Sequence, residues 1–154
     1  KPKKKEQEMT LSLAESCTGG AIAARIVNVS GASEVFLQGM VTYSNKAKRR
    51  CLDVSKSTLK KHGAVSEECA AEMAKGGRKA SKTDICLSVT GIAGPGGGTK
   101  EKPIGLVYIS IRYNGITRIK EIKLSPNISR KEMKEQFANQ ALKLALDTLT
   151  KDRI

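Results

Sequence analysis

The feature of this chain that most restricts its fold is the alternation of strand-like and helix-like segments along most of its length. Residues 9–16, 35–43 and 83–90 have the alternating or continuously apolar pattern of strands, and segments with helical spacing separate them. Near the C-terminus, two apolar segments flank Asn114-Gly115, a strong short signal for a tight β-hairpin. Helices interspersed with strands, together with this hairpin, predict an α/β sandwich built on a mixed sheet.

Length and the N-terminal sequence set the expected domain organisation. A chain of 154 residues is long enough for one domain with its own hydrophobic core. No apolar run approaches the roughly 18 residues that a membrane span requires, and KPKKKEQEMT lacks the apolar region of a secretory signal. We therefore expect residues 1–8 to be a flexible basic tail and residues 9–151 to be a single domain. We also expect a soluble, cytoplasmic protein without membrane association.

The cysteines and the single histidine, His62, are poor material for a metal centre. The chain contains no CxxC pair, and its cysteines show neither zinc-ligand spacing nor a disulfide framework. We expect no metal site, and we expect reduced thiols that pack as small apolar side chains. The four cysteines are Cys17, Cys51, Cys69 and Cys86.

The formal net charge of +13 requires nucleic-acid binding to be considered. Part of this charge lies in the N-terminal tail, and part lies in residues 46–61, where seven basic residues accompany the single acid Asp53. Aromatic residues make up only 3% of the chain, too few for a platform that stacks single-stranded bases. A generally lysine-rich surface is therefore favoured over a dedicated nucleic-acid site, and non-specific contact with nucleic acid is retained as an alternative.

Three polar loops follow the ends of predicted strands. They are ESCTGG at 15–20, TYSNKAK at 42–48 and TGIAGPGGG at 90–98. In open α/β sheets, ligands bind beyond the carboxyl ends of the strands. If the three loops share that edge of the sheet, they form one pocket.

The first of these loops contains a candidate nucleophile, Ser16. Its glycines match neither the P-loop nor the dinucleotide-binding pattern, and the serine is not in a GxSxG context. With only one histidine in the chain, a Ser-His-Asp triad is improbable. A lysine can act as the base if burial or a cationic neighbour lowers its pKa, and Lys46 is a candidate, the alternative being a solvated lysine. Glu15 either orients Lys46 or pairs on the surface. Thr18 is a plausible N-cap for the following helix.

Five segments, in order, resemble the CinA C-terminal domain family, which includes the nicotinamide mononucleotide amidohydrolases. They are AESCTGG, VTYSNKAK, HGAVSEE, SVTGIAGPGGG and KPIGLVYI. The resemblance covers residues 9–113 strongly and 114–150 more loosely. It implies a three-layer α/β/α fold, hydrolysis of the nucleotide carboxamide to nicotinate mononucleotide and ammonia in pyridine nucleotide salvage, and no metal or organic cofactor.

The resemblance also assigns roles to particular residues. It implies that Ser16 is the nucleophile, that Lys46 is its partner base in a Ser-Lys dyad and that Tyr43 lies beside them. From the chemistry of the residues, we expect the oxyanion to be held by backbone N–H groups around Thr18-Gly19-Gly20 or by Thr90. The substrate phosphate would be held either by Arg130 or by the glycine-rich loop at 91–98, and the resemblance does not decide between them. The residues expected to bind substrate are Thr18, Gly19, Gly20, Thr90, Gly91, Gly94, Gly97 and Arg130.

One segment departs from the family pattern. Family members usually carry a glycine-containing segment where this chain has LSPNISR, with Pro126 in place of the glycine. Arg130 is therefore the assignment least supported by the resemblance.

Two functions stay open: the amidohydrolase, and a non-catalytic protein linked to competence and DNA damage that binds nucleic acid through its basic surface. A homodimer is expected from the general frequency of such assemblies.

Overall fold

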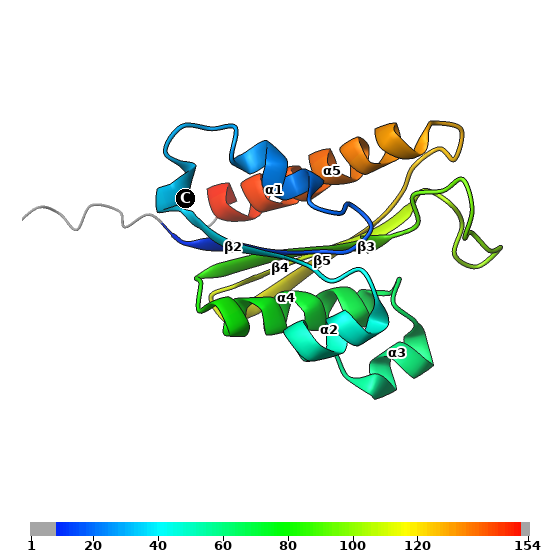
Figure 1. Ribbon diagram of the computed structural model, residues 1–154, viewed down its shortest axis with the longest axis horizontal. Coiled ribbons are helices and arrows are strands. Elements are labelled where there is room, and N and C mark those ends of the chain that lie inside the picture. Colours follow the sequence, from blue (N-terminus) through cyan, green and yellow to red (C-terminus); the bar gives the residue numbers. More distant parts are fainter. Residues whose placement is uncertain (1–8, 152–154) are drawn as a thin grey trace, which may run out of the picture.

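The computed structural model describes residues 9–151 and shows a five-stranded mixed sheet (Figure 1). The tail expected at residues 1–8 lies outside the described residues. The spatial order of the strands is β2-β1-β3-β4-β5. In chain order the strands are β1 (Leu11–Glu15), β2 (Phe36–Val41), β3 (Ile85–Gly91), β4 (Leu106–Tyr113) and β5 (Ile116–Lys123).

Helices cover both faces of this sheet, so the predicted three-layer α/β/α sandwich is confirmed (Figure 1). The helices α1 (Ala21–Ile26) and α5 (Arg130–Lys151) lie together on one face. The other face carries α2 (Asn45–Leu52), α3 (Lys56–His62) and α4 (Glu67–Ser81). A short 3-10 helix, Ala32–Glu34, precedes β2. None of the helices in the described part of the chain is long and apolar enough to cross a membrane.

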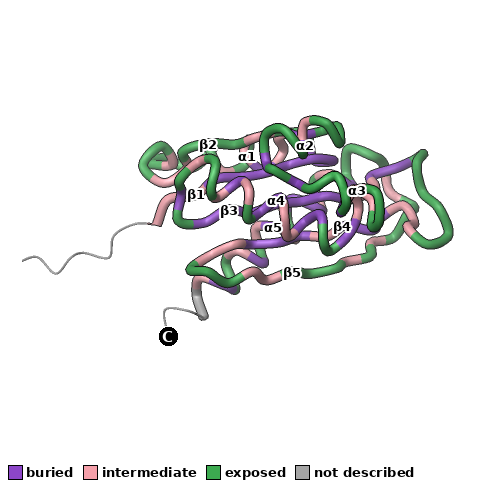
Figure 2. Tube along the Cα trace, turned by 90° about the horizontal axis from the view of Figure 1, so that it is seen from below, coloured by how far each residue is buried: buried purple, intermediate pink, exposed green. Residues whose placement is uncertain are grey.

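The strands in the middle of the sheet are buried on both faces, whereas β2 and β5 at its edges are largely exposed (Figure 2). Leu13 packs with Phe137 in the cluster under α1 and α5, and the neighbouring Ala14 packs in the cluster under α2 and α4. This alternation follows from the pleat, which points successive side chains to opposite faces. Phe137 is fully buried, so its truncation to alanine should cost about 3–5 kcal/mol.

The direction of the strands determines where the loops meet. Strands β1, β2 and β3 are parallel to one another, so their carboxyl ends lie at the same edge of the sheet. Strand β4 is antiparallel to β3, and β5 is antiparallel to β4. Asn114 and Gly115 connect β4 to β5 with φ values of 56° and 76°, as a two-residue hairpin turn with positive φ at both positions requires. The predicted hairpin is confirmed.

Candidate active site

The side chains of Ser16 and Lys48 meet at the carboxyl edge of the sheet. The Nζ atom of Lys48 lies 2.9 Å from the Oγ atom of Ser16. Both residues are buried, with exposed fractions of 7% for Ser16 and 1% for Lys48. Ser16 directly follows β1, and the alternation of that strand turns its side chain towards the layer that contains α2. A hydroxyl and an amine are thus held together out of solvent.

The lysine beside Ser16 is not the predicted Lys46, which is exposed. Helix α2 begins at Asn45, where the hydroxyl of Ser44 accepts a hydrogen bond of 3.0 Å from the amide of Ala47. With 3.6 residues per turn, Lys46 and Lys48 point about 200° apart around the helix. One therefore faces water and the other faces the sheet, and the assignment of Lys46 as the partner of Ser16 is corrected to Lys48.

The sequence does indicate Lys48, because the helical spacing shows which face of α2 packs on the sheet. Lys48 and Leu52 are four residues apart, so they lie on the same face of the helix, and both are buried. Once the helix start at Asn45 is fixed, the face that carries Leu52 is the one that packs on the sheet. Choosing the lysine on this face, rather than the first lysine after Ser44-Asn45, would have identified Lys48.

Burial and backbone carbonyls define the surroundings of the Lys48 amine. Its Nζ atom also donates to the carbonyl oxygens of Thr42, at 3.0 Å, and Tyr43, at 3.5 Å. Burial lowers the pKa of Lys48 below its usual value, because the charged form loses its hydration. Among the residues whose side chains the structure describes, no carboxylate forms an ion pair with it. The environment therefore favours the neutral amine more than water does.

Glu15 caps helix α1, a role that neither alternative for this residue had included. Its carboxylate accepts hydrogen bonds from the amides of Gly20, Ile22 and Ala23 at 3.1, 3.2 and 2.9 Å. The hydroxyl of Thr18 donates to the same carboxylate at 2.5 Å. The helix begins after Gly20, so Thr18 is not its N-cap. A buried carboxylate at the positive end of a helix stabilises the turn that carries Ser16.

This capping changes the expected role of the two glycines. The amide of Gly20 is bound to Glu15, and the amide of Gly19 donates to the carbonyl oxygen of Ser16 at 3.1 Å. Neither amide is free to bind a substrate in this arrangement. The prediction that Gly19 and Gly20 donate hydrogen bonds to the oxyanion is therefore wrong for this structure. Within the described part of the chain, the amides of Cys17 and Thr18 have no oxygen acceptor. Of the predicted Thr18-Gly19-Gly20 donors, the Thr18 amide therefore remains available.

Cys17 is an alternative nucleophile by position, but its chemistry is unfavourable. Its thiol is buried, and burial raises the pKa of Cys17 to about 12. A thiol reacts as the thiolate, so very little of Cys17 is reactive near neutral pH.

Among the residues whose side chains are described, no three His, Cys, Asp or Glu side chains gather as metal ligands.

Thr90 lies at the end of β3, next to the loop that contains Ser16. The amide of Ser16 donates to the carbonyl oxygen of Val89, at 3.2 Å, which ties the two strand ends together. The buried hydroxyl of Thr90, however, donates to the carbonyl oxygen of Ala64 at 2.9 Å. This bond holds the segment between α3 and α4 against the sheet. Thr90 is therefore close to the site through its backbone, while its hydroxyl has a structural partner.

Arg130 joins two of the three loops. At the start of α5, its Nη1 atom donates to the carbonyl oxygen of Gly94 at 2.5 Å, and its Nη2 atom donates to the hydroxyl oxygen of Tyr43 at 3.0 Å. Tyr43 is 61% exposed, although its carbonyl contacts Lys48. The loops after β2 and β3 are thus brought together at one edge, as the positions of their strands predict.

The loop after β3 contains glycines at Gly91, Gly94 and Gly97, and a different structural constraint accounts for each of them. A side chain at Gly91 would lie 2.7 Å from the carbonyl oxygen of Leu106, so close packing against β4 requires glycine there. Gly94 has φ of +81°, and a side chain would lie 2.6 Å from Cγ2 of Ile104. Gly97 is exposed and has φ of +90°. Backbone geometry explains these three residues, and a role in lining the pocket stays a prediction.

Comparison with known proteins places this geometry in a family. The sequence model of the CinA C-terminal domain matches residues 2–149. The CinA-like protein of Kosmotoga olearia is 52% identical over 139 residues, which cover 90% of this chain and 32% of that protein. A putative competence-damage inducible protein of Clostridium perfringens is 59% identical over 116 residues, covering 75% of this chain and 28% of that protein. The chain thus spans about a third of the length of these relatives.

Solved structures show the same likeness. The competence/damage inducible protein CihA from Agrobacterium tumefaciens has 41% identity and a TM-score of 0.88, with coverage of 90% of this chain and 84% of that one. A CinA superfamily protein from Escherichia coli has 30% identity and a TM-score of 0.86, with coverage of 90% and 80%. The chain belongs to the CinA C-terminal domain family.

Proposed function

We propose that this chain is an amidohydrolase in which Ser16 attacks a carboxamide and Lys48 is the base. The observation that carries this proposal is the buried contact of 2.9 Å between the hydroxyl of Ser16 and the amine of Lys48. An isolated buried lysine is costly, so its position against a serine calls for a reason beyond packing. Nicotinamide mononucleotide is the proposed substrate because the sequence motifs resemble those of enzymes that deamidate it.

The contacts of Lys48 suggest how its lone pair is directed. A neutral amine has two N–H groups and one lone pair. The carbonyl oxygens of Thr42 and Tyr43 can only accept hydrogen bonds, so they take the two N–H groups. The lone pair then points towards Ser16, whose hydroxyl can donate its proton. This arrangement suits a general base that activates a nucleophile.

The proposed reaction has two stages, formation of an acyl-enzyme and its hydrolysis. Oγ of Ser16 bonds to the carboxamide carbon while its proton moves to Lys48. The protonated amine next gives this proton to the departing nitrogen, the C–N bond breaks and ammonia leaves. A water molecule, deprotonated by Lys48, attacks the acyl-enzyme, and Ser16 recovers its proton as nicotinate mononucleotide leaves. We expect the amide of Thr18 to stabilise the oxyanion in both stages.

Arg130 is the preferred group for the substrate phosphate. Its guanidinium has five N–H donors, and the two contacts to Gly94 and Tyr43 leave others free. These contacts hold the side chain at the carboxyl edge of the sheet. Arg130 is exposed, so a ligand can reach it from solvent. A fixed guanidinium binds phosphate through parallel hydrogen bonds.

The test is ammonia release from nicotinamide mononucleotide by the purified chain, compared with Ser16→Ala. The proposal expects turnover by the parent and a loss of at least about 10³-fold in the variant, because the covalent route is removed. Circular dichroism confirms that the variant is folded. A folded parent without turnover would refute the substrate, and equal turnover by both proteins would refute Ser16 as nucleophile.

A further inference from the structure

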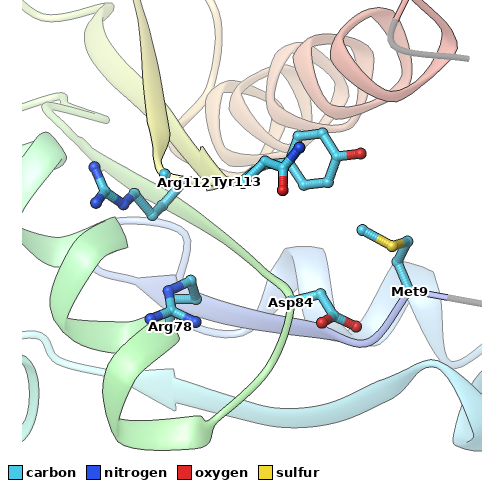
Figure 3. Close-up of a pocket in the computed structure, with 7 residues that line it drawn as sticks. Met9, Arg78, Asp84, Arg112 and Tyr113 are labelled. Carbon is cyan, nitrogen blue, oxygen red and sulfur yellow. The ribbon is translucent and has the colours of Figure 1, made fainter.

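A second site candidate lies at the opposite end of the sheet from Ser16. It is a cavity of about 320 Å³ between the start of β3 and the β4–β5 hairpin (Figure 3). Arg78 reaches it from α4, Arg112 from the end of β4, and Asp84 from the residue before β3. Tyr113 and Asn114 also line it. The candidate active site lies beyond the carboxyl end of β1, whereas this cavity lies near its first residues, so the two are separate.

The two arginines of this cavity are held in place by neutral partners. Nη1 of Arg112 donates to the hydroxyl of Thr117 at 2.8 Å, and Nη1 of Arg78 donates to the carbonyl oxygen of Thr83 at 3.3 Å. Among residues 9–149, neither guanidinium forms an ion pair with a carboxylate. Two fixed positive charges therefore line one cavity, and each retains N–H donors that these contacts do not use.

The acid in the cavity neutralises these arginines only in part. One carboxylate oxygen of Asp84 accepts hydrogen bonds from the amide and the hydroxyl of Thr10, at 2.9 and 3.0 Å. Asp84 thereby fixes the entry to β1. Asp84 keeps its charge, so it offsets only one of the two arginine charges, and the lining of the cavity has a net charge of +1. An anion bound between the two arginines would balance this remaining charge.

We propose that this cavity binds a small phosphate monoester through Arg78 and Arg112. Guanidinium groups match the geometry of phosphate oxygens and bind them through paired hydrogen bonds. A volume of about 320 Å³ is at the lower end of the range of small-molecule pockets, so it suits a metabolite and not a polymer. The ring of Tyr113 packs on the opposite face of the sheet, so it does not form a wall beside the two arginines. This site is independent of the proposed amidohydrolase reaction.

Isothermal titration calorimetry with inorganic phosphate and with glycerol 3-phosphate, at constant ionic strength, tests the proposal. The parent should bind one equivalent of each ligand at this cavity, and the Arg130→Gln variant, which lacks the phosphate group proposed for the candidate active site, should retain this equivalent. The dissociation constant should rise roughly tenfold or more in Arg112→Gln and in Arg78→Gln, because each loses charge-assisted hydrogen bonds.

The matched control is Arg118→Gln. Arg118 is also half-buried on β5 and donates to a threonine hydroxyl, that of Thr148 at 2.6 Å, but it lies outside the cavity. Its replacement removes the same charge and should change the dissociation constant less than about twofold. Ser16→Ala and Arg130→Gln should likewise keep binding, which excludes the candidate active site as the source of the signal.

Three results would overturn the proposal: no saturable binding by the parent, equal weakening in Arg118→Gln, or loss of binding in Arg130→Gln alone. If Arg112→Gln and Arg78→Gln do not fold, amide chemical shifts of the unaltered protein decide. Phosphate should then shift the amides of Asn114 and Gly115, whether or not amides near Arg130 also shift. Unchanged amides at Asn114 and Gly115 would refute the site.

Discussion

Lys48 lies 2.9 Å from Ser16, and the same amine nitrogen contacts two backbone carbonyls. These contacts join the end of β1, the loop after β2 and the helix α2 at one point. A lysine in such a place is buried and paired only with neutral groups in the described part of the chain. Its protonation state therefore governs both the proposed reaction and the stability of the fold.

The pH dependence of turnover should follow the neutral form of Lys48. Burial lowers the pKa of Lys48 from the usual value of about 10.4, so the neutral fraction grows as the pH rises towards this lowered pKa. The value of kcat/KM should rise about tenfold per pH unit below that pKa and level off above it. Initial rates of ammonia release between about pH 6 and pH 9 measure this. A rate that falls as pH rises over this range would contradict the role of Lys48.

Lys48→Met should stabilise the folded protein while removing turnover. Because the pKa of Lys48 is lower in the folded than in the unfolded chain, the unfolded state binds more protons between the two values. The lysine therefore destabilises the fold below its folded-state pKa, and this penalty disappears as the pH rises to about 10.4. Replacement by an apolar side chain of similar length should raise the free energy of unfolding by about 1 kcal/mol or more near pH 7. Urea denaturation at pH 7 and at pH 9.5 measures the difference, which should shrink at the higher pH. A methionine variant that is less stable at pH 7 would count against the account.

Glu15→Gln should weaken the turn that carries Ser16. The carboxylate accepts hydrogen bonds from three amides of the first turn of α1, and an amide side chain offers only one acceptor oxygen to them. The loss should lower the free energy of unfolding by about 1–3 kcal/mol and reduce kcat. The control is Glu34→Gln at an exposed acid, which should change neither quantity measurably. Equal effects from the two variants would show that the cap has no special importance.

Arg130→Gln should affect substrates that carry a phosphate more than those that lack one. The test compares nicotinamide mononucleotide with nicotinamide riboside. The value of KM for the nucleotide should rise roughly tenfold or more, whereas turnover of the riboside should change little. Tyr43→Phe removes the hydroxyl that accepts from Arg130 and should have a smaller effect in the same direction. Equal losses with both substrates would mean that Arg130 supports the loops and does not bind phosphate.

The positions of helices and strands could be predicted from the sequence because their local signals agree with the packing. The helix over Asn45–Leu52 and the hairpin at Asn114-Gly115 have cap or turn residues where the fold needs them. The strand order and the contact between Gly94 and Arg130 could not be predicted, because they depend on residues far apart in the chain.

The candidate site shows the same division between local and long-range signals. Ser16 could be identified from its position between a strand and a helix. Its partner could not, because SNKAK contains two lysines and only the packed face of α2 distinguishes Lys48 from Lys46. The capping role of Glu15 depends on the turn between residues 16 and 20, which periodicity does not reveal.

The most direct test of the Ser16–Lys48 pair compares Lys48→Ala with Lys46→Ala. The two substitutions are chemically identical and lie two residues apart on one helix, but only Lys48 contacts Ser16. Ammonia release from nicotinamide mononucleotide should fall at least about 10²-fold in Lys48→Ala, as expected for loss of a general base, and should stay within about twofold of the parent in Lys46→Ala. Both variants are checked for folding by circular dichroism. Retained turnover in a folded Lys48→Ala variant, or an equal loss in Lys46→Ala, would contradict the proposed catalytic pair.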